Sequence, residues 1–277
     1  MMRGATLLKW LAIIFFLIPM LLVLIFPFLV MISTSFKTIQ EVFQIPPTFI
    51  PKAPTLANFS EIWDIIPLAK HFRNSLFLGV GEVLLVFLLG VPAAYAVTRF
   101  RFGGRQPYML FLLVTQMFPA VVMMLGIFRL VATYRLVNNL VVVAFVAGAF
   151  NLAFCIWLLV GYFSGIPPEI EEAAMMDGHS RVGAMIKMTL PLSWPGLVAV
   201  AIFAFMDGWN EFLFSLTLIR TADYLPLTVG LYRFITRFQI QWNHLMAGSF
   251  LATVVVVILF MTVQDKLTRG LVAIGEK

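Results

Sequence analysis

The chain has 277 residues, of which 61% are hydrophobic and 12% are charged, and its mean hydropathy is +0.99. Soluble domains average about 45–50% apolar and about 25% charged residues, so this composition excludes a water-soluble protein and indicates an integral membrane protein. The formal net charge is +6. The basic residues stand singly at the ends of apolar segments, which argues against nucleic-acid binding and for charges that flank a membrane.

The first apolar segment runs from Leu11 to Ile32. It is longer than the apolar core of a secretory signal peptide, which spans about 7–15 residues, and no small-residue cleavage pattern follows it. We therefore expect a retained first transmembrane helix at about residues 10–32. The more polar segment that follows, about residues 33–72, is expected outside the membrane.

A membrane-spanning helix needs about 20 mostly apolar residues, because its backbone polar groups must pair internally. Six segments meet this requirement, which predicts an all-α integral membrane protein with six transmembrane helices. Prolines within or near them predict kinks. The expected helices cover about residues 10–32, 74–98, 108–131, 138–163, 195–218 and 246–264, and the prolines are Pro19, Pro27, Pro92 and Pro119.

Six crossings would place both termini on the same side of the membrane. Arg3 and Lys9 precede the first helix, and "RFRFGGR" joins the second and third, so the positive-inside rule makes both regions cytoplasmic. A cytoplasmic loop then lies between helices four and five. We expect one transmembrane domain, residues 1–277, with core helices at about 74–264, the loop at about 164–194 and a cytoplasmic tail at about 265–277.

The cytoplasmic loop includes "IPPEIEEAAMMDGHSRVGAMIKMTLPLSWP", residues 166–195. Its paired prolines suit a helix start, and three glutamates then favour the positive end of the helix dipole. Gly178 permits a left-handed turn, and a second short helix is expected at about 179–189, ended by Pro191. Such a helix–turn–helix with an acidic rim fits a groove on a cytosolic partner. The alternative, an amphipathic loop on lipid headgroups, is disfavoured because anionic lipid repels the acids.

These residues resemble the EAA loop of ATP-binding-cassette importer permeases. In that loop Glu-Ala-Ala is followed by a glycine and later by an apolar residue, a spacer and Leu-Pro. The family's loop docks the ATPase subunit, so the resemblance implies ATPase coupling here, with Met188 replacing the usual isoleucine. The coupling residues would be Glu172, Ala173, Ala174, Asp177, Gly178, Leu190 and Pro191.

The resemblance covers nearly the whole chain. The segments that carry it include "TSFKTIQEVFQIPPTFIPKAPTLANF", "RNSLFLGV", "PAAYAVTRFRFGGR", "MFPAVVMMLGIFRLVATYRLVNN", "WNEFLFSLTLI" and "DKLTRGLVAIGEK". They resemble the carbohydrate-uptake branch, and the last resembles the second membrane subunit of the maltose-transporter type. This implies a bacterial or archaeal cytoplasmic (inner) membrane location and four kinds of partner. These are a second homologous permease, two ATP-binding ATPase subunits, an extracytoplasmic solute-binding protein and membrane lipid.

The sequence shows no motif for nucleotide binding, metal binding or catalysis. It lacks the pattern G-x-x-x-x-G-K-[ST] that cradles nucleotide, and its three histidines and single cysteine show no metal-ligand spacing. Cys155 lies inside an apolar segment, where we expect a packed thiol. We therefore expect a chain that is not an enzyme and holds no cofactor, with ATP and Mg bound by the partner ATPases.

Polar residues within the expected fifth helix, "FMDGWNEFLF", are the candidates for a solute pathway. Asp207, Asn210 and Glu211 are spaced to share one helical face, and Trp209 offers flat apolar surface to a sugar. An acid at the bilayer centre costs roughly 2.5–3.5 kcal/mol, so that face must meet a polar cavity or polar partners. A translocation pathway and a structural clasp both satisfy this. For Glu82 on the second helix, structural pairing is favoured.

The external segment at residues 219–245 follows the fifth helix. In the resembling family this region reaches toward the solute-binding protein, so Arg220, Arg233 and Arg237 are candidates for that contact. Arginines at headgroup level are the other interpretation.

Two rival functions remain open from the residues. An ion-gradient-driven secondary transporter would use Asp207, Glu211 and Glu82 as ion sites. A purely structural membrane subunit would have no pathway. The identity of the solute is not predicted.

Overall fold

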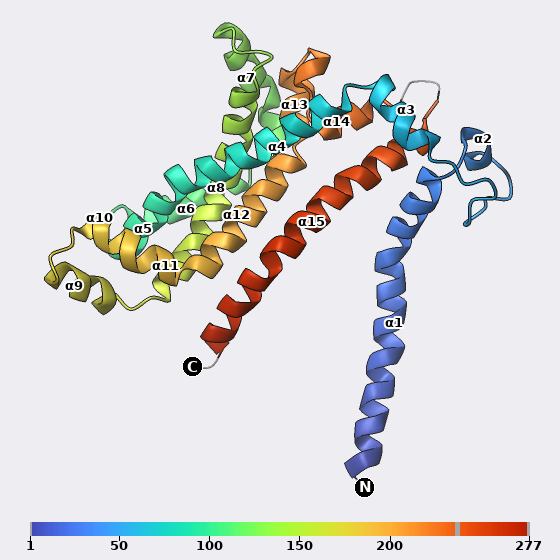
Figure 1. Ribbon diagram of the computed structural model, residues 1–277. Coiled ribbons are helices and arrows are strands. Elements are labelled where there is room, and N and C mark those ends of the chain that lie inside the picture. The colour runs from blue at the N-terminus through green and yellow to red at the C-terminus, as the bar shows by residue number, and fades with distance from the viewer. Residues whose placement is uncertain (1, 236–238, 276–277) are drawn as a thin grey trace. The chain divides into compact units, whose positions relative to one another are not determined.

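The computed structural model describes the backbone of residues 2–235 and 239–275 and the side chains of residues 14–235, 239–262 and 264. The described chain is mostly helical, from α1 to α15, with one isolated antiparallel bridge between Ile235 and Ile240 (Figure 1). It forms two compact units, Met1–Ile66 with Leu231–Val255 and Pro67–Gly230 with Val256–Lys277. The predicted all-α membrane class is confirmed.

Within the described residues, five helical segments are long and apolar enough to cross a membrane. The third expected crossing, residues 108–131, is a bent pair and not one helix. α6 (Arg105–Gln116) and α7 (Ala120–Thr133) meet at 95°, and counting the pair as one broken span gives six crossings. The five segments are Ile14–Ser35, Leu68–Arg99, Leu140–Ser164, Trp194–Leu218 and Trp242–Thr262, of which Trp194–Leu218 is interrupted at residues 210–212.

The first unit begins with α1 (Met2–Ser35), a helix that contains both Pro19 and Pro27. Its apolar side chains from Ile14 to Leu29 are exposed on every face. A helix that is apolar all round and not covered by its own chain suits contact with lipid or with another transmembrane subunit.

A buried asparagine organises the segment after α1. Asn58 on α3 (Ala57–Ile65) donates hydrogen bonds to the carbonyl oxygens of Ser35 and Lys37, both at 2.8 Å. It accepts one at 2.7 Å from Asn243, near the start of α15 (Trp242–Gly275). Because these amides satisfy backbone carbonyls that α1 leaves unpaired at its end, they fix where the polar segment departs. The short helix α2 (Ile39–Val42) lies between α1 and α3.

The core of the second unit consists of three helices that pack side by side, α4 (Leu68–Leu85), α8 (Leu140–Ser164) and α12 (Trp194–Trp209) (Figure 1). The closest approach is at Gly208 of α12. A Cβ atom there would lie 2.7 Å from the carbonyl oxygen of Leu78 and 2.8 Å from the Cα atom of Gly79. Small residues permit such backbone contact between membrane helices.

Breaks in the helices coincide with local features of the sequence. The π turn η1 (Val86–Gly90) joins α4 to α5 (Val91–Arg99) just before Pro92, which lacks an N–H for the regular ladder. Pro119 is the N-cap of α7 and stands at the sharp bend. The sequence predicted kinks at both prolines. It did not predict the break after Asn210, which divides the expected helix 195–218 into α12 and α13 (Leu213–Leu218).

Polar contacts link the start of α4 to the segment that follows α13. Lys70 forms an exposed ion pair with Asp223 at 2.7 Å, in the turn η3 (Ala222–Tyr224). Asn74 donates to the carbonyl oxygen of Leu225 at 3.0 Å, just before α14 (Leu227–Tyr232). Residues 219–230 are therefore held onto the helical core and are not a free loop.

Candidate functional site

The loop that sequence analysis singled out folds as a helix, a tight turn and a second helix. α9 (Glu169–Met176) follows Pro168 and carries its acids in the first turn, where the helix dipole favours negative charge. α9 ends in a Schellman turn. His179 N–H donates to Ala174 O and Gly178 N–H to Met175 O, both at 3.1 Å.

Gly178 adopts φ +92°, the left-handed conformation that this turn requires. Apart from Gly178 itself and its two chain neighbours, no atom of the described residues lies within 4 Å of where a Cβ would stand on Gly178. Within this chain, the backbone conformation alone therefore demands glycine. Open space around the turn also means that another protein surface can reach it.

The second helix of the loop begins later and ends later than expected. Ser180 caps α10 (Arg181–Ala184) by accepting a hydrogen bond from Gly183 N–H at 3.1 Å. The π turn η2 (Met185–Thr189) and the short α11 (Leu190–Leu192) follow. Pro191 was expected to end the helix, but the helical residues continue through it to Leu192, and the π turn η2 lies just before it, as η1 lies before Pro92.

The loop has an outward face that its own chain leaves exposed. Glu172, Ala173, Asp177 and Pro191 are exposed, and Leu190 is half-buried. Large apolar side chains share this exposure, with Met176 at 89%, Val182 at 60% and Ile186 at 55%. Of the seven predicted coupling residues, Ala174 alone is buried against its own chain, at 3% exposure.

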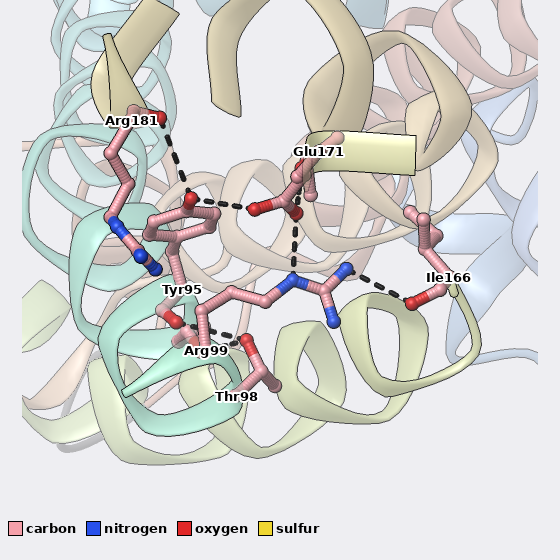
Figure 2. Close-up of polar contacts among 8 residues, drawn as sticks. Tyr95, Thr98, Arg99, Ile166, Glu171 and Arg181 are labelled. Atoms are coloured by element: carbon pink, nitrogen blue, oxygen red, sulfur yellow. Dashed lines mark hydrogen bonds and ion pairs between the residues drawn. The ribbon is translucent and has the colours of Figure 1, made fainter. Parts of the chain in front are cut away.

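The loop also has an inward face built on one carboxylate (Figure 2). Glu171 is 3% exposed and accepts hydrogen bonds from Arg99 Nε at 2.6 Å and from Tyr95 Oη at 2.7 Å, both on α5. Thr189 Oγ1 of η2 donates to the same carboxylate. Burial by itself raises the pKa of Glu171, but these hydrogen bonds and the Arg99 charge outweigh it, so the pKa lies below its ordinary value.

Sequence analysis missed the partners of Glu171, namely Tyr95, Arg99 and Thr189. Tyr95 and Arg99 are four residues apart in "YAVTR" and therefore share a helix face. Arg99 was interpreted only as a cytoplasmic flanking charge. The four-residue spacing of Tyr95 and Arg99 indicated a polar helix face. It did not indicate that Arg99 pairs with Glu171, 72 residues later.

Glu211 does not share the predicted face with Asp207 and Asn210, because α12 ends at Trp209 and Glu211 lies in the break that follows. Asn210 is exposed and its side chain donates to Met206 O at 2.8 Å. Glu211 is 7% exposed, and its side chain caps α13, the helix that follows it. Its carboxylate accepts from Phe214 N at 2.7 Å and Ser215 N at 2.9 Å, so in this chain it satisfies the first N–H groups of the new helix.

The remaining intramembrane candidates lie where α4 and α12 meet. Asp207 is exposed on α12, whereas Trp209 is 4% exposed and stacks against Phe205 with ring centroids 5.9 Å apart. Glu82 on α4 is fully buried, and the Asn151 amide donates to it at 3.5 Å. Trp209 is thus packed within the helices, whereas Asp207 is exposed and shares a side-chain hydrogen bond with Glu82 across the contact of α12 with α4.

Two of the three arginines that are predicted to be external lie in described segments. Arg220 is exposed, and its guanidinium stands 5.7 Å from the centre of the Phe128 ring. Arg233 is exposed just after α14. Arg237 lies outside the described residues.

Together, the apolar helices of membrane-spanning length define a polytopic membrane protein. Comparison with known proteins gives the family. Residues 86–272 match the model of the binding-protein-dependent transport system inner membrane component. The chain belongs to this family, the membrane permease component of ATP-binding-cassette transporters, and the ion-gradient alternative is not favoured.

Individual relatives match over most of their length. The chain is 32% identical to the inner membrane ABC transporter permease protein YcjP of Escherichia coli K12, covering 93% of this chain and 92% of that protein. It is 32% identical to the sulfoquinovosyl glycerol transport system permease protein SmoH of Agrobacterium fabrum, over 91% and 89%. It is 31% identical to the trehalose/maltose transport system permease protein MalG of Thermococcus litoralis, over 92% of each.

A solved structure supports the fold. The chain resembles a subunit of a bacterial ABC transporter involved in the import of the acidic polysaccharide alginate, with a TM-score of 0.81 and 23% sequence identity. The match covers 95% of this chain and 97% of that one. The two chains therefore share a fold.

Proposed function

We propose that this chain is one of two permease subunits of an importer for a carbohydrate or related solute, driven by ATP hydrolysis in separate subunits. The observation that carries the proposal is the two-faced loop α9–α11. Its inner face is anchored to the membrane helices, and its outer face exposes apolar side chains around a turn that the chain itself does not cover. Relatives whose names state trehalose/maltose and sulfoquinovosyl glycerol transport support the solute class.

The complex would contain a second homologous permease, two ATPase subunits that bind ATP and Mg, and an extracytoplasmic solute-binding protein. In this arrangement the outer face of the loop, with Glu172, Ala173, Asp177 and Gly178, sits in a groove of an ATPase subunit. Closure of the ATPase pair on nucleotide moves the loop as a rigid body and turns the permease cavity outward. The loop and both termini are then cytoplasmic.

Within the membrane, Asp207 and Asn210 are the groups best placed to line the solute pathway, because both are exposed at the end of α12. A carboxylate and an amide together supply acceptors and donors for sugar hydroxyls. Glu211 and Trp209 support this end of the helix from within. On the external side, Arg220 and Arg233 are candidate contacts for the solute-binding protein, and Arg237 is retained as a third.

The test uses the complete complex, purified through a tag on this chain, and compares Gly178→Arg with Gly178→Asn. Asparagine tolerates the left-handed conformation, whereas arginine strains the turn and fills the open space above it. We expect Gly178→Arg to lower the copurified ATPase by about tenfold or more, equivalent to about 1.4 kcal/mol of binding, while the chain still inserts. Gly178→Asn should retain more ATPase than Gly178→Arg.

Uptake in vesicles supplies the second measurement. Radiolabelled maltose, trehalose and diacetylchitobiose are offered with the binding protein and internal ATP, with and without a protonophore. Uptake that survives loss of the proton gradient is expected. Uptake abolished by the protonophore at constant ATP would contradict the ATP-driven mechanism, and undiminished ATPase association in Gly178→Arg would contradict the docking assignment.

A further inference from the structure

Glu171 differs from the other acids of α9 in its surroundings. Glu169 and Glu172 are exposed, whereas Glu171 is buried among partners from two other elements. A buried carboxylate is costly unless it is paired and hydrogen-bonded, and a pair that is broken on one side leaves an uncompensated buried charge. The buried Glu171 carboxylate therefore needs its partners, because the loss of one partner would leave it charged and uncompensated.

The carboxylate joins three parts of the chain, and Figure 2 shows its contacts with Tyr95 and Arg99. It belongs to α9, it receives Arg99 and Tyr95 from α5, and it receives Thr189 from η2. The Arg99 guanidinium also donates from Nη2 to Ile166 O at 3.0 Å, just before α9 begins. Arginine suits this role because its planar fork can meet two acceptors in fixed directions.

These side-chain bonds are the main direct link between α9 and α5. The backbone of α9 packs mainly on α10 and η2, which are parts of the same loop. α5 in turn packs against α8 and continues through η1 into α4, the helix that carries Glu82 and meets α12. Among the described side-chain contacts, the Glu171 cluster joins α9 directly to α5.

We propose that Glu171 and Arg99 are positioning residues that make α5 follow the coupling loop when an ATPase subunit moves it. The inference rests on the proposed function. It assigns the motion to α5 and, through η1, to α4, in addition to the helices joined covalently to the loop. Tyr95 and Thr189 hold the carboxylate in the orientation that Arg99 needs.

The experiment measures whether α9 and α5 move together in the complete complex. Spin labels are placed at Glu169→Cys on α9 and Arg101→Cys two residues beyond α5, both exposed positions. The background carries Cys155→Ser, which keeps a donor beside Asn151 Oδ1. A second pair, Arg101→Cys with Arg135→Cys, reports whether nucleotide moves the permease at all. Distances are compared without nucleotide and with ATP, Mg and vanadate.

We expect the α9–α5 distance of the otherwise wild-type complex to be the same in both states. In Arg99→Met and in Glu171→Gln it should shift with nucleotide, the shifted fraction rising by about 2- to 30-fold. The double variant should behave like either single one, because both remove the same joint. Arg105→Met removes a nearby positive charge for which the described residues show no ion pair, and should behave as wild type.

A merely structural role predicts a different result, in which the variants assemble less well but α9 and α5 keep their distance in every assembled complex. Either that result or a nucleotide-dependent change of the α9–α5 distance in the wild type would contradict the proposal that Glu171 and Arg99 make α5 follow α9. Should Arg99→Met fail to assemble, Arg99→Lys and Tyr95→Phe apply the same test with milder loss. Absence of any nucleotide response in the second label pair would count against the proposed function itself.

Discussion

Glu171 and Glu172 are neighbours of identical chemistry with opposite surroundings. The sequence motif drew attention to Glu172, which is exposed, and gave no sign that Glu171 is the buried one. In a helix as short as α9 the hydrophobic pattern is too brief to define an inner face. The inner face is decided by Tyr95 and Arg99, which lie 76 and 72 residues away in sequence. Local pattern alone does not carry that information.

The lowered pKa of Glu171 makes stability depend on pH in a definite direction. Its folded-state pKa lies below its ordinary value, so its contribution is fully present above the ordinary glutamate pKa and is lost as pH falls through the folded-state value. We expect the thermal unfolding temperature of the detergent-purified chain to fall between about pH 5 and about pH 3 less steeply in Glu171→Gln than in wild type. The exposed change Glu169→Gln should keep the wild-type slope, and equal slopes in all three proteins would contradict the prediction.

Helices were predictable where hydropathy alone decides them. The long apolar segments predicted the positions of the five spans and of the bent pair. Pro92 and Pro119 predicted two of the breaks. Both signals are local in the sequence. The 95° angle at Pro119 was not predictable, since proline dictates a break and not its angle. The end of α12 was missed because no proline marks it. The break is stabilised by Glu211, which caps α13 in place of continuing α12.

The contact of α12 with α4 offers a prediction about packing. Gly208→Ala would place a methyl group against the backbone of Leu78 and Gly79, at distances of 2.7 and 2.8 Å, so the helices must separate. We expect a loss of about 1–3 kcal/mol in the free energy of unfolding. The measurement is unfolding of the purified chain in mixed micelles by a denaturing detergent.

Gly161→Ala is the matched control for that measurement. Gly161 lies within α8 and has nothing within 4 Å of an added Cβ. The substitution should leave stability unchanged or raise it by up to about 1 kcal/mol, the difference in helix propensity. A loss as large as that of Gly208→Ala would show that the effect belongs to glycine replacement in general and not to this contact.

For the whole molecule, family membership follows from the comparisons, while its orientation in the membrane remains a prediction. The positive-inside rule places Arg101 in the cytoplasm, and the expected crossing at residues 108–131 then places Arg135 outside. In a Cys155→Ser background, Arg135→Cys should react with a membrane-impermeant maleimide in intact spheroplasts. Arg101→Cys should react only after the membrane is permeabilised. The opposite pattern would invert the topology and move α9 to the outer surface.

The hydrogen bonds that close the turn after α9 have one more consequence. The turn is closed by backbone groups alone, and α9 is tethered by an acid on its concealed side. The exposed residues of the loop, Glu172, Ala173 and Met176 among them, consequently contribute little to the folding of this chain. If they form the proposed ATPase contact, exchanging them for those of a related importer would change the partner ATPase while leaving the turn and the Glu171 contacts intact.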